Sequence, residues 1–385
     1  MSRLPTALFI DHAGVLGGAE LSLLDIVAAF GARGEVLLLA DGPFRHLLEA
    51  RGVAVRVEPL GALARVKKET RLPHPASAVD AIRIARRIAK QAGGRDLLYA
   101  NSQKAFVVAA AAGLLAGKPV VWHLRDILAP PHFSTTNVRA ASTLANLRAA
   151  RVIANSQATA NAFVAAGGRA ALVRVVHNGV DAAPFDAAGP DEAAAVRREL
   201  GIPPGAFVIA MFGRFHPWKG QQVLLDALVG LDGVHALIVG APLFGEELFA
   251  SALRAQAERL GVTARAHFLG FRHDIPVLMA AADVVVHSSV YPEPFGRVVV
   301  EGMLARRPVV ATRAGGITEL VTDGETGVLV PPGDAAAMAR AIAGLHADPA
   351  RAAGIAARGA RHAREHFSVG AMVRGVEVAL EGVAR

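Results

Sequence analysis

The 385-residue chain contains no cysteine, which excludes a disulfide framework and any metal site built on thiolates. It also lacks an Asp-x-Asp sequence, the carboxylate pair that would signal a metal bridging to a diphosphate. A metal site would have to be built from scattered His, Asp and Glu side chains, so we expect no metal and no cofactor. The absence of cysteine fits a reducing compartment, and we expect a cytoplasmic protein.

Long hydrophobic runs are also missing. The longest spans residues 105–117 and falls short of the roughly 20 residues that cross a bilayer as a helix. The first apolar run, within residues 1–9, is short and is followed by Asp11 and His12, which is unlike a signal peptide. We therefore expect neither a cleaved leader nor a transmembrane helix.

Charged residues make up only 19% of the chain, aromatic residues 5% and hydrophobic residues 53%. This composition excludes intrinsic disorder and predicts a well-packed globular protein, whose length favours two domains. The net charge of +8 raises the question of a nucleic-acid partner. The chain has no recognised nucleic-acid-binding motif and few aromatic side chains, so we expect no such partner.

Much of the positive charge lies between residues 62 and 95, where only Glu69 and Asp80 oppose it. The basic residues there are Arg65, Lys67, Lys68, Arg71, Arg83, Arg86, Arg87, Lys90 and Arg95. The apolar residues with helical spacing are Val79, Ile82, Ile84 and Ile88. The helix predicted for residues 78–91 is either a surface helix of an α/β domain or an interfacial helix that touches a membrane. A general Arg-rich composition would also account for the charge.

Short β-branched apolar runs alternate with helical patterns, which is typical of buried parallel strands joined by helical crossovers. The predicted strands are residues 7–11, 35–40, 54–58, 96–100, 119–123, 151–154, 171–176, 207–212, 234–239, 265–269, 283–287, 308–312 and 327–330. Residues 181–204 carry no strand and are rich in Ala, Gly, Pro and charge. We predict an α/β protein of two doubly wound, Rossmann-like domains, 1–181 and 182–369. Ligands of such sheets lie beyond the carboxyl ends of the strands, so we expect the site in a cleft between two facing domains.

The strongest local signal is the segment from Glu293 to Glu301, which follows a predicted strand and opens a helix. A glycine at the helix start lets the backbone approach a ligand, and the unpaired amides of the first turn face an anion. The amides expected to point at a diphosphate or at sugar hydroxyls are those of Phe295, Gly296, Arg297 and Val298. Glu293 can accept hydrogen bonds from sugar hydroxyls, and Glu301, predicted two turns into the helix, can grip a ribose diol. The alternative is an acidic residue before a helix and one solvated Glu.

A second signal lies in the loop after the predicted strand 207–212. Arg214 and Lys219 flank a proline-containing turn there, and a helix is predicted to begin near Gly220. Two cations on a strand-to-helix loop can neutralise a leaving diphosphate without a metal. Taken alone, they could equally be two solvated loop cations.

A glycine-rich loop, residues 11–20, links the first predicted strand to the first helix and contains Gly14, Gly17 and Gly18. Its spacing matches neither the G-x-G-x-x-G fingerprint nor the P-loop. The spacing therefore does not support a nicotinamide or P-loop site, but it allows a glycine loop that lies over a ligand.

Polar residues end three other strands of the first predicted domain. His123 could contact a sugar hydroxyl, act as a base, or be a buried histidine with satisfied hydrogen bonds. The Asn178-Gly179 pair predicts a tight turn at the end of the last strand. Ser156 is predicted to cap the helix that follows it.

Together these segments resemble glycosyltransferase family 4, the retaining enzymes with a GT-B fold. The motifs that carry the resemblance are Gly17–Glu20, His123, Asn178–Asp181, Gly213-Arg214, Lys219-Gly220 and Glu293–Glu301, followed by residues 314–319 and 324–327. The motifs from 17 to 301 occur in the order of the family, and their joint match is specific.

The resemblance implies a role for each matched position. Arg214 and Lys219, next to Gly213, would hold the donor diphosphate, and Glu301 would hold the ribose. The positions implied to contact the transferred sugar are Glu293, the backbone of Phe295 to Arg297, and His123 near the outer hydroxyls. The remaining donor contacts would be Gly17 or Gly18 over the phosphates and the segment from Phe271 to Asp274 around the base.

The sequence departs from the family pattern at two places. Arg297 stands where the family usually has an apolar residue; this is harmless if only the backbone matters, but the guanidinium could also reach donor or acceptor. Arg272 and His273 lie beside the implied base pocket and leave the nucleotide base open, so the donor is either a UDP-sugar or a GDP-sugar.

The resemblance also implies metal-independent retention through front-face attack, in which a donor phosphate oxygen takes the acceptor proton and no dedicated base is needed. It further implies hinges near Asp181 and at the end of the chain. A C-terminal helix, residues 370–385, would return to the acceptor-binding first domain. The second domain would bind the donor, and the basic segment hints at an anionic or lipid-linked acceptor and at peripheral membrane contact. The alternatives are another GT-B enzyme, either an epimerase or an inverting transferase with His123 as base, and a non-catalytic sugar-nucleotide-binding protein.

Overall fold

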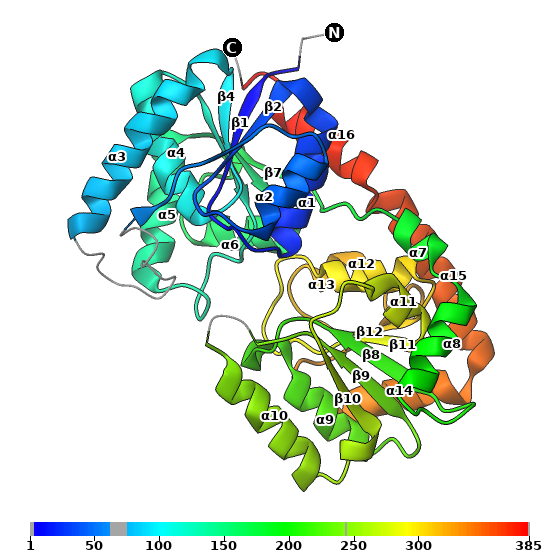
Figure 1. Ribbon diagram of the computed structural model, residues 1–385. Coiled ribbons are helices and arrows are strands. Elements are labelled where there is room, and N and C mark those ends of the chain that lie inside the picture. Colours follow the sequence, from blue (N-terminus) through cyan, green and yellow to red (C-terminus); the bar gives the residue numbers. More distant parts are fainter. Residues whose placement is uncertain (1–3, 62–74, 243–244, 384–385) are drawn as a thin grey trace. The chain divides into compact units, whose positions relative to one another are not determined.

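The computed structural model describes residues 4–61, 75–242 and 245–383. The chain divides into two compact units: unit 1 is Met1–Gly179 with Val369–Arg385, and unit 2 is Val180–Ser368. The division predicted from the sequence lies within two residues of this one at each boundary. Each unit contains a parallel sheet covered by helices, which confirms the predicted fold class (Figure 1).

Unit 1 is built on a parallel sheet whose described strands follow the order β3-β2-β1-β4-β5-β6-β7. The strands are β1 (Ala7–Asp11), β2 (Gly34–Leu38), β3 (Val55–Val57), β4 (Leu97–Ala100), β5 (Val120–Leu124), β6 (Ala149–Ala154) and β7 (Val173–Val175). The helices that pack on one face are α1 (Gly18–Phe30), α2 (Pro43–Ala50) and α16 (Val369–Leu380). Those on the other face are α3 (Pro75–Gln91), α4 (Gln103–Ala116), α5 (Thr135–Arg148) and α6 (Gln157–Ala165). The central strands are buried on both faces, and this explains why they read as continuous apolar runs.

Unit 2 contains a second parallel sheet, with its described strands in the order β10-β9-β8-β11-β12-β13. The strands are β8 (Val208–Phe212), β9 (His235–Val239), β10 (Ala266–Gly270), β11 (Val284–His287), β12 (Val309–Thr312) and β13 (Val328–Val330). One face packs on α8 (Pro190–Glu199), α11 (Ile275–Ala280), α12 (Arg297–Leu304), α13 (Ile317–Leu320) and α15 (Pro349–His366). The other face packs on α9 (Gln221–Val229), α10 (Glu247–Arg259) and α14 (Ala335–Ala347). Residues 181–204 carry no strand, as predicted, and contain the short helix α7 (Ala183–Ala187) before α8.

Helix α3 differs from the predicted pattern. Ile84 and Ile88 are buried in the core, whereas Val79 and Ile82 are 56% and 52% exposed. These four residues do not share one buried face, because only the pairs three or four apart lie on a common side of the helix. Of the basic segment, Arg65, Lys67, Lys68 and Arg71 lie outside the described residues. Across the described ranges, no helix combines the length and the apolar character needed to cross a bilayer.

Two local predictions are wrong. The Asn178-Gly179 pair forms no tight turn: no turn is assigned to it, and Asn178 is buried with its side chain bonded to Arg125. Glu301 is the fifth residue of α12, so it lies about one turn from the helix start rather than two, since the helix begins only at Arg297. Ser156 does cap α6, accepting a hydrogen bond from the amide of Thr159 at 3.0 Å.

Candidate functional site

The site in unit 2 lies where the strand order reverses. Strands β8 and β11 are neighbours, while the chain continues from β8 to β9 on one side and from β11 to β12 on the other. The loops after β8 and β11, residues 213–220 and 288–296, leave the carboxyl ends of these two strands. Such a switch point is where parallel α/β sheets bind ligands.

The two loops are packed closely together. Gly220 has a φ of +80°, and a Cβ atom on it would lie 1.9 Å from the carbonyl oxygen of Ser288. The amide of Val290 donates a 2.8 Å hydrogen bond to the carbonyl of Trp218. A glycine is therefore required at position 220, which explains the Lys219-Gly220 motif by close approach of the backbone.

Arg214 and Lys219 are brought to the same aromatic ring. The Arg214 guanidinium carbon lies 5.9 Å from the centroid of the Trp218 ring, and Nζ of Lys219 lies 5.0 Å from it. Both cations are partly exposed, and Gly213 precedes them with a φ of +153°. The loop thus gathers two positive charges beside the end of β8, as the sequence predicted.

Glu293 is the buried centre of the site. Its Oε1 atom accepts hydrogen bonds from Nζ of Lys219 at 2.5 Å and from Oγ of Ser289 at 2.5 Å. Nε2 of His287 lies 3.3 Å from the same oxygen. Burial alone would raise the pKa of Glu293, but the charge and hydrogen bond of Lys219, with His287 close by, outweigh it and hold the pKa well below its ordinary value. The carboxylate is therefore ionised and locked in place.

His287 and Ser289 were not predicted as site residues. His287 ends β11, where its Nδ1 atom lies 3.3 Å from the hydroxyl of Thr312 at the end of β12. The signal for both lay in their position at or just after the end of a buried strand and before Glu293. Only the fold reveals that they converge on one carboxylate oxygen.

The segment that opens α12 is shaped by glycines. Gly296 has a φ of +97°, and a Cβ atom on it would lie 2.1 Å from Cδ1 of Ile317. Across the next loop, a Cβ on Gly315 would lie 2.3 Å from the carbonyl oxygen of Glu293, and the amide of Gly316 donates to that oxygen at 2.8 Å. These contacts position the first-turn amides of α12, which include that of Val298, at the carboxyl end of the sheet; Phe295 is buried beneath them.

Glu301 and Arg297 form a pair one turn apart on α12. Nε of Arg297 donates to Oε1 of Glu301 at 2.7 Å, and their side chains are only 18% and 14% exposed. Glu301, which is predicted to hold a ribose, is therefore already bonded to Arg297, the residue that departs from the family pattern.

The positions implied for the base follow β10. Phe271 is 65% exposed, and its ring lies 4.8 Å from that of His273 in an edge-on arrangement. Asp274 is engaged by Arg272 through two hydrogen bonds of 2.8 and 2.6 Å, and this bonding lowers the pKa of the carboxyl. Phe271 thus offers an exposed ring, whereas the Asp274 side chain already serves Arg272.

Unit 1 also has a polar cluster where its strand order reverses, between β1 and β4. Nδ2 of Asn101 donates to Asp11 at 2.5 Å, and Nε of Arg125 donates to Oδ1 of Asn101 at 3.0 Å. Nη1 of the same guanidinium donates to Oδ1 of Asn178 at 2.5 Å. This buried network joins β1, β4 and β5 to the end of unit 1, and neither Asn101 nor Arg125 was predicted from the sequence.

The glycine-rich loop lies next to this network. Gly17 and Gly18 are exposed at the start of α1, and a Cβ atom on Gly17 would lie 2.8 Å from Oε2 of Glu20. Burial and then the Asp11 carboxylate raise the pKa of Glu20 to about 7. Gly17 therefore leaves room for the Glu20 carboxyl group beside it, and its placement over a phosphate stays a prediction.

His123 is enclosed inside unit 1. Its side chain has 0% exposure, and its Nδ1 atom bonds to the hydroxyl of Tyr99. Burial, and next the charge of Arg125, hold the pKa of His123 well below its ordinary value. A neutral, fully enclosed imidazole is badly placed to take a proton from an acceptor, which counts against the alternative in which His123 is the base.

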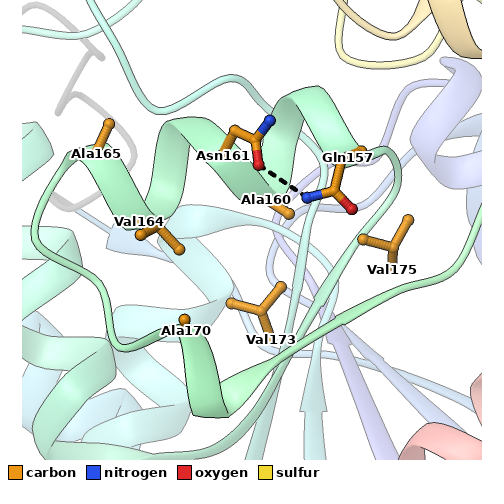
Figure 2. A pocket seen from close by; sticks show the side chains of 8 residues that line it. All are labelled: Gln157, Ala160, Asn161, Val164, Ala165, Ala170, Val173 and Val175. Carbon is orange, nitrogen blue, oxygen red and sulfur yellow. Dashed lines mark hydrogen bonds between the residues drawn. The ribbon is translucent and has the colours of Figure 1, made fainter.

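A hollow of about 560 Å³ lies elsewhere in unit 1, between α6 and β7 (Figure 2). Its lining is mostly apolar, with the amides of Gln157 and Asn161 bonded to each other at 2.8 Å. None of the predicted site residues lines it, so we do not assign it to the site. In the described ranges, no group of three His, Cys, Asp or Glu side chains is arranged to hold a metal ion.

Comparison with known families matches both halves of the chain. The family described as Glycosyltransferase Family 4 matches residues 16–183, and Glycosyl transferases group 1 matches residues 193–362. The D-inositol 3-phosphate glycosyltransferase of Mycobacterium avium is 36% identical over 200 residues, which are 51% of this chain and 46% of the relative. The corresponding Mycobacterium tuberculosis protein is 37% identical over 183 residues, 37% of its length. The chain therefore matches less than half the length of these curated relatives.

Similar solved structures cover almost the whole chain. HepE from Anabaena, solved with UDP-glucose, is 43% identical, with a TM-score of 0.89 over 98% of this chain and 99% of HepE. Sucrose-phosphate synthase from Thermosynechococcus elongatus shares the fold at 21% identity, with a TM-score of 0.78 over 96% of this chain and 97% of the synthase. The chain accordingly belongs to glycosyltransferase family 4 and is a glycosyltransferase with the GT-B fold.

Proposed function

We propose that this enzyme transfers a hexose with retention from a UDP-linked donor to an anionic acceptor, without a metal ion. The observation that carries the proposal is the convergence of Arg214, Lys219, Glu293 and the first turn of α12 at one switch point of unit 2. Positive side chains and free helix amides are the groups that bind a diphosphate. UDP is favoured over GDP because the 43%-identical HepE was solved with UDP and with UDP-glucose.

In the proposed reaction the acceptor oxygen attacks the anomeric carbon from the face that the diphosphate leaves. The bond from this carbon to the acceptor oxygen forms as its bond to the phosphate oxygen breaks. The acceptor proton passes to an oxygen of the departing diphosphate. Arg214 and Lys219 stabilise the negative charge that develops there. No side-chain base is needed, which agrees with the enclosure of His123.

The acceptor is proposed from two observations. The curated relatives are named for an inositol phosphate, a polyhydroxylated anion.

The outer side of α3 carries both basic and apolar side chains. Arg83 and Arg87 are 62% and 56% exposed there, and Val79 and Ile82 are exposed as well. A helix face with apolar and basic residues can rest on an anionic bilayer. We therefore propose a cytoplasmic enzyme that makes peripheral contact with the inner face of the membrane.

Two measurements test the donor and the chemistry. Calorimetric titration should give tighter binding for UDP than for GDP or ADP, with no effect of a chelator. With UDP-glucose as donor and inositol 3-phosphate as the first acceptor, proton NMR of the product should show the α-anomeric configuration of the donor. A β-linked product would contradict retention, and turnover that stops in EDTA would contradict metal independence.

Vesicle sedimentation tests the membrane contact. The protein should sediment with vesicles that contain phosphatidylglycerol and stay in solution with pure phosphatidylcholine vesicles. The double variant Val79→Ser, Ile82→Ser should lose this difference while its turnover of a soluble acceptor is unchanged. Equal sedimentation of the variant and the wild type would refute a role for this face.

A further inference from the structure

Helix α12 begins with a cationic residue, which the partial positive charge of a helix N-terminus disfavours. Arg297 is the first helical residue, after the N-cap Gly296. The unpaired amides make a helix N-terminus partially positive, so a cation there is unfavourable. The order Arg then Glu four residues on is also the weaker orientation for a helical ion pair. Helix stability therefore does not account for an arginine at this position, and a break with local rules often marks a functional residue.

The surroundings of Arg297 are those of the proposed donor site. Helical side chains lean toward the N-terminus, so Glu301 reaches back to the first turn, where its Oε1 atom accepts from Nε of Arg297 at 2.7 Å. Both side chains are mostly buried. The guanidinium is therefore held beside the amides of the first turn, at the carboxyl end of the strand that leads to Glu293.

The order of groups along a nucleotide determines what Arg297 would meet. In the proposed function, which this inference rests on, Glu301 takes the ribose while Arg214 and Lys219 take the phosphate next to the sugar. The phosphate attached to the ribose must lie between these two places. Arg297 sits one helical turn from Glu301 on the N-terminal side, where the first-turn amides proposed for the diphosphate also lie.

We propose that the Arg297 side chain binds the ribose-proximal phosphate of the nucleotide while it holds the Glu301 carboxylate for the ribose hydroxyls. A guanidinium has five N–H donors in a planar fork, enough to serve a carboxylate and a phosphate together. A positive charge is unfavourable at a helix N-terminus by itself and becomes favourable once a phosphate is bound there. The apolar residue usual in the family at this position could supply only its backbone amide.

Binding of uridine, UMP and UDP to the wild type and to Arg297→Leu separates the two contacts. We expect Arg297→Leu to weaken UMP and UDP by the same factor, about tenfold or 1.4 kcal/mol, because both carry the proximal phosphate. Uridine affinity, measured by ligand-observed NMR, should change by less than about threefold. Lys219→Ala should instead weaken UDP more than UMP, and Glu301→Gln should weaken all three ligands.

Two further variants keep the test independent of folding. Arg297→Gln retains a donor for Glu301 but removes the charge, so it should lose phosphate affinity as Arg297→Leu does. Arg340→Leu removes an exposed cation from α14 and should change none of the affinities. Thermal unfolding without ligand shows whether each variant is folded.

The outcomes that overturn the inference differ from those that overturn the function. If Arg297→Leu weakens uridine as much as UMP, Arg297 acts only through Glu301. If UMP and UDP bind Arg297→Leu and Arg297→Gln as tightly as they bind the wild type, the guanidinium has no part in binding, although the donor proposal stands. If the wild type binds no uridine or guanosine nucleotide, the proposed function fails and this inference fails with it.

Discussion

Nζ of Lys219 lies 2.5 Å from Oε1 of Glu293, so the cation proposed for the diphosphate is paired with the carboxylate proposed for the sugar. The pair keeps the Glu293 carboxylate ionised and holds both side chains in place before a donor binds. A donor that binds here would place its diphosphate at Lys219 and its sugar at Glu293, two residues that already contact each other. The site is thus preorganised, which is the condition under which a fixed charge stabilises a transition state most.

Removal of the Lys219 ammonium should slow turnover far more than it weakens binding. By analogy with loss of a preorganised oxyanion donor, Lys219→Ala should lower kcat about 10²- to 10³-fold, or about 2.7–4 kcal/mol of barrier. Steady-state kinetics with the donor varied gives kcat and KM separately. Arg340→Ala, which removes an exposed cation of α14, is the control and should leave both unchanged. Normal turnover by Lys219→Ala would show that this lysine does not stabilise the leaving group.

Gly220→Ala should disrupt the contact between the two site loops. The added Cβ would lie 1.9 Å from the Ser288 carbonyl oxygen, at a φ of +80° that non-glycine residues disfavour. The control is Gly261→Ala, with a φ of +68° and open space around its Cβ position. Urea unfolding should show a loss of about 1–2 kcal/mol for the control, from the backbone alone. Gly220→Ala should lose about 1–3 kcal/mol more, from overpacking, and should also lose activity. Equal losses in the two variants would contradict a required close approach.

The central strands were predictable because each is a short, buried run of apolar residues. Strand β11 is an example: Val284–His287 was predicted within one residue. A strand covered on both faces has apolar residues at nearly every position, so it appears in the sequence as a continuous apolar run. The ends of the helices were predicted less accurately, because they depend on individual hydrogen bonds. The start of α12 depends on the left-handed Gly296, and this moved Glu301 from two turns into the helix to one.

The partners within the site could not be predicted. The positions of Arg214, Lys219 and Glu293 at strand ends follow from the motif and the alternation of elements. That His287 and Ser289 meet Glu293 depends on rotamers and loop packing that no periodicity encodes. Similarly, Asn178 was read as half of an Asn-Gly turn. Its pairing with Arg125, far away in the sequence, overrode that local preference.

The His235–His267 pair should make unit 2 sensitive to mild acid. Nδ1 of His235 lies 3.0 Å from Nε2 of His267 on the neighbouring edge strand β10. Burial, then Arg265, lowers the pKa of His235 from 6.5, and burial, then His235, lowers the pKa of His267. The unfolded chain therefore binds more protons, and stability should fall as the pH drops below about 6.5 toward the folded-state pKa values.

Urea unfolding between pH 7 and pH 5 measures this dependence. The variant His267→Gln keeps a hydrogen-bonding group but no longer titrates, so its stability should fall less steeply over this range. His46→Gln, which alters a histidine that is 69% exposed, should leave the slope as it is in the wild type. If His267→Gln and the wild type have the same slope, the pair does not set the acid response.

Arg125 should contribute more to stability than any surface arginine of unit 1. It is 7% exposed and donates to the side-chain oxygens of Asn101, at 3.0 Å, and of Asn178, two residues that are 0% and 5% exposed. Arg125→Met removes both donors and leaves two buried amide oxygens without them, which should cost about 2–5 kcal/mol. Arg174→Met, on the exposed side of the edge strand β7, should cost less than about 0.5 kcal/mol. Urea unfolding of unit 1, followed by the fluorescence of the buried Trp122, measures both variants. A loss for Arg125→Met as small as that for Arg174→Met would mean that water replaces the guanidinium, and the network would then not be what ties β1, β4 and β5 to the end of the unit.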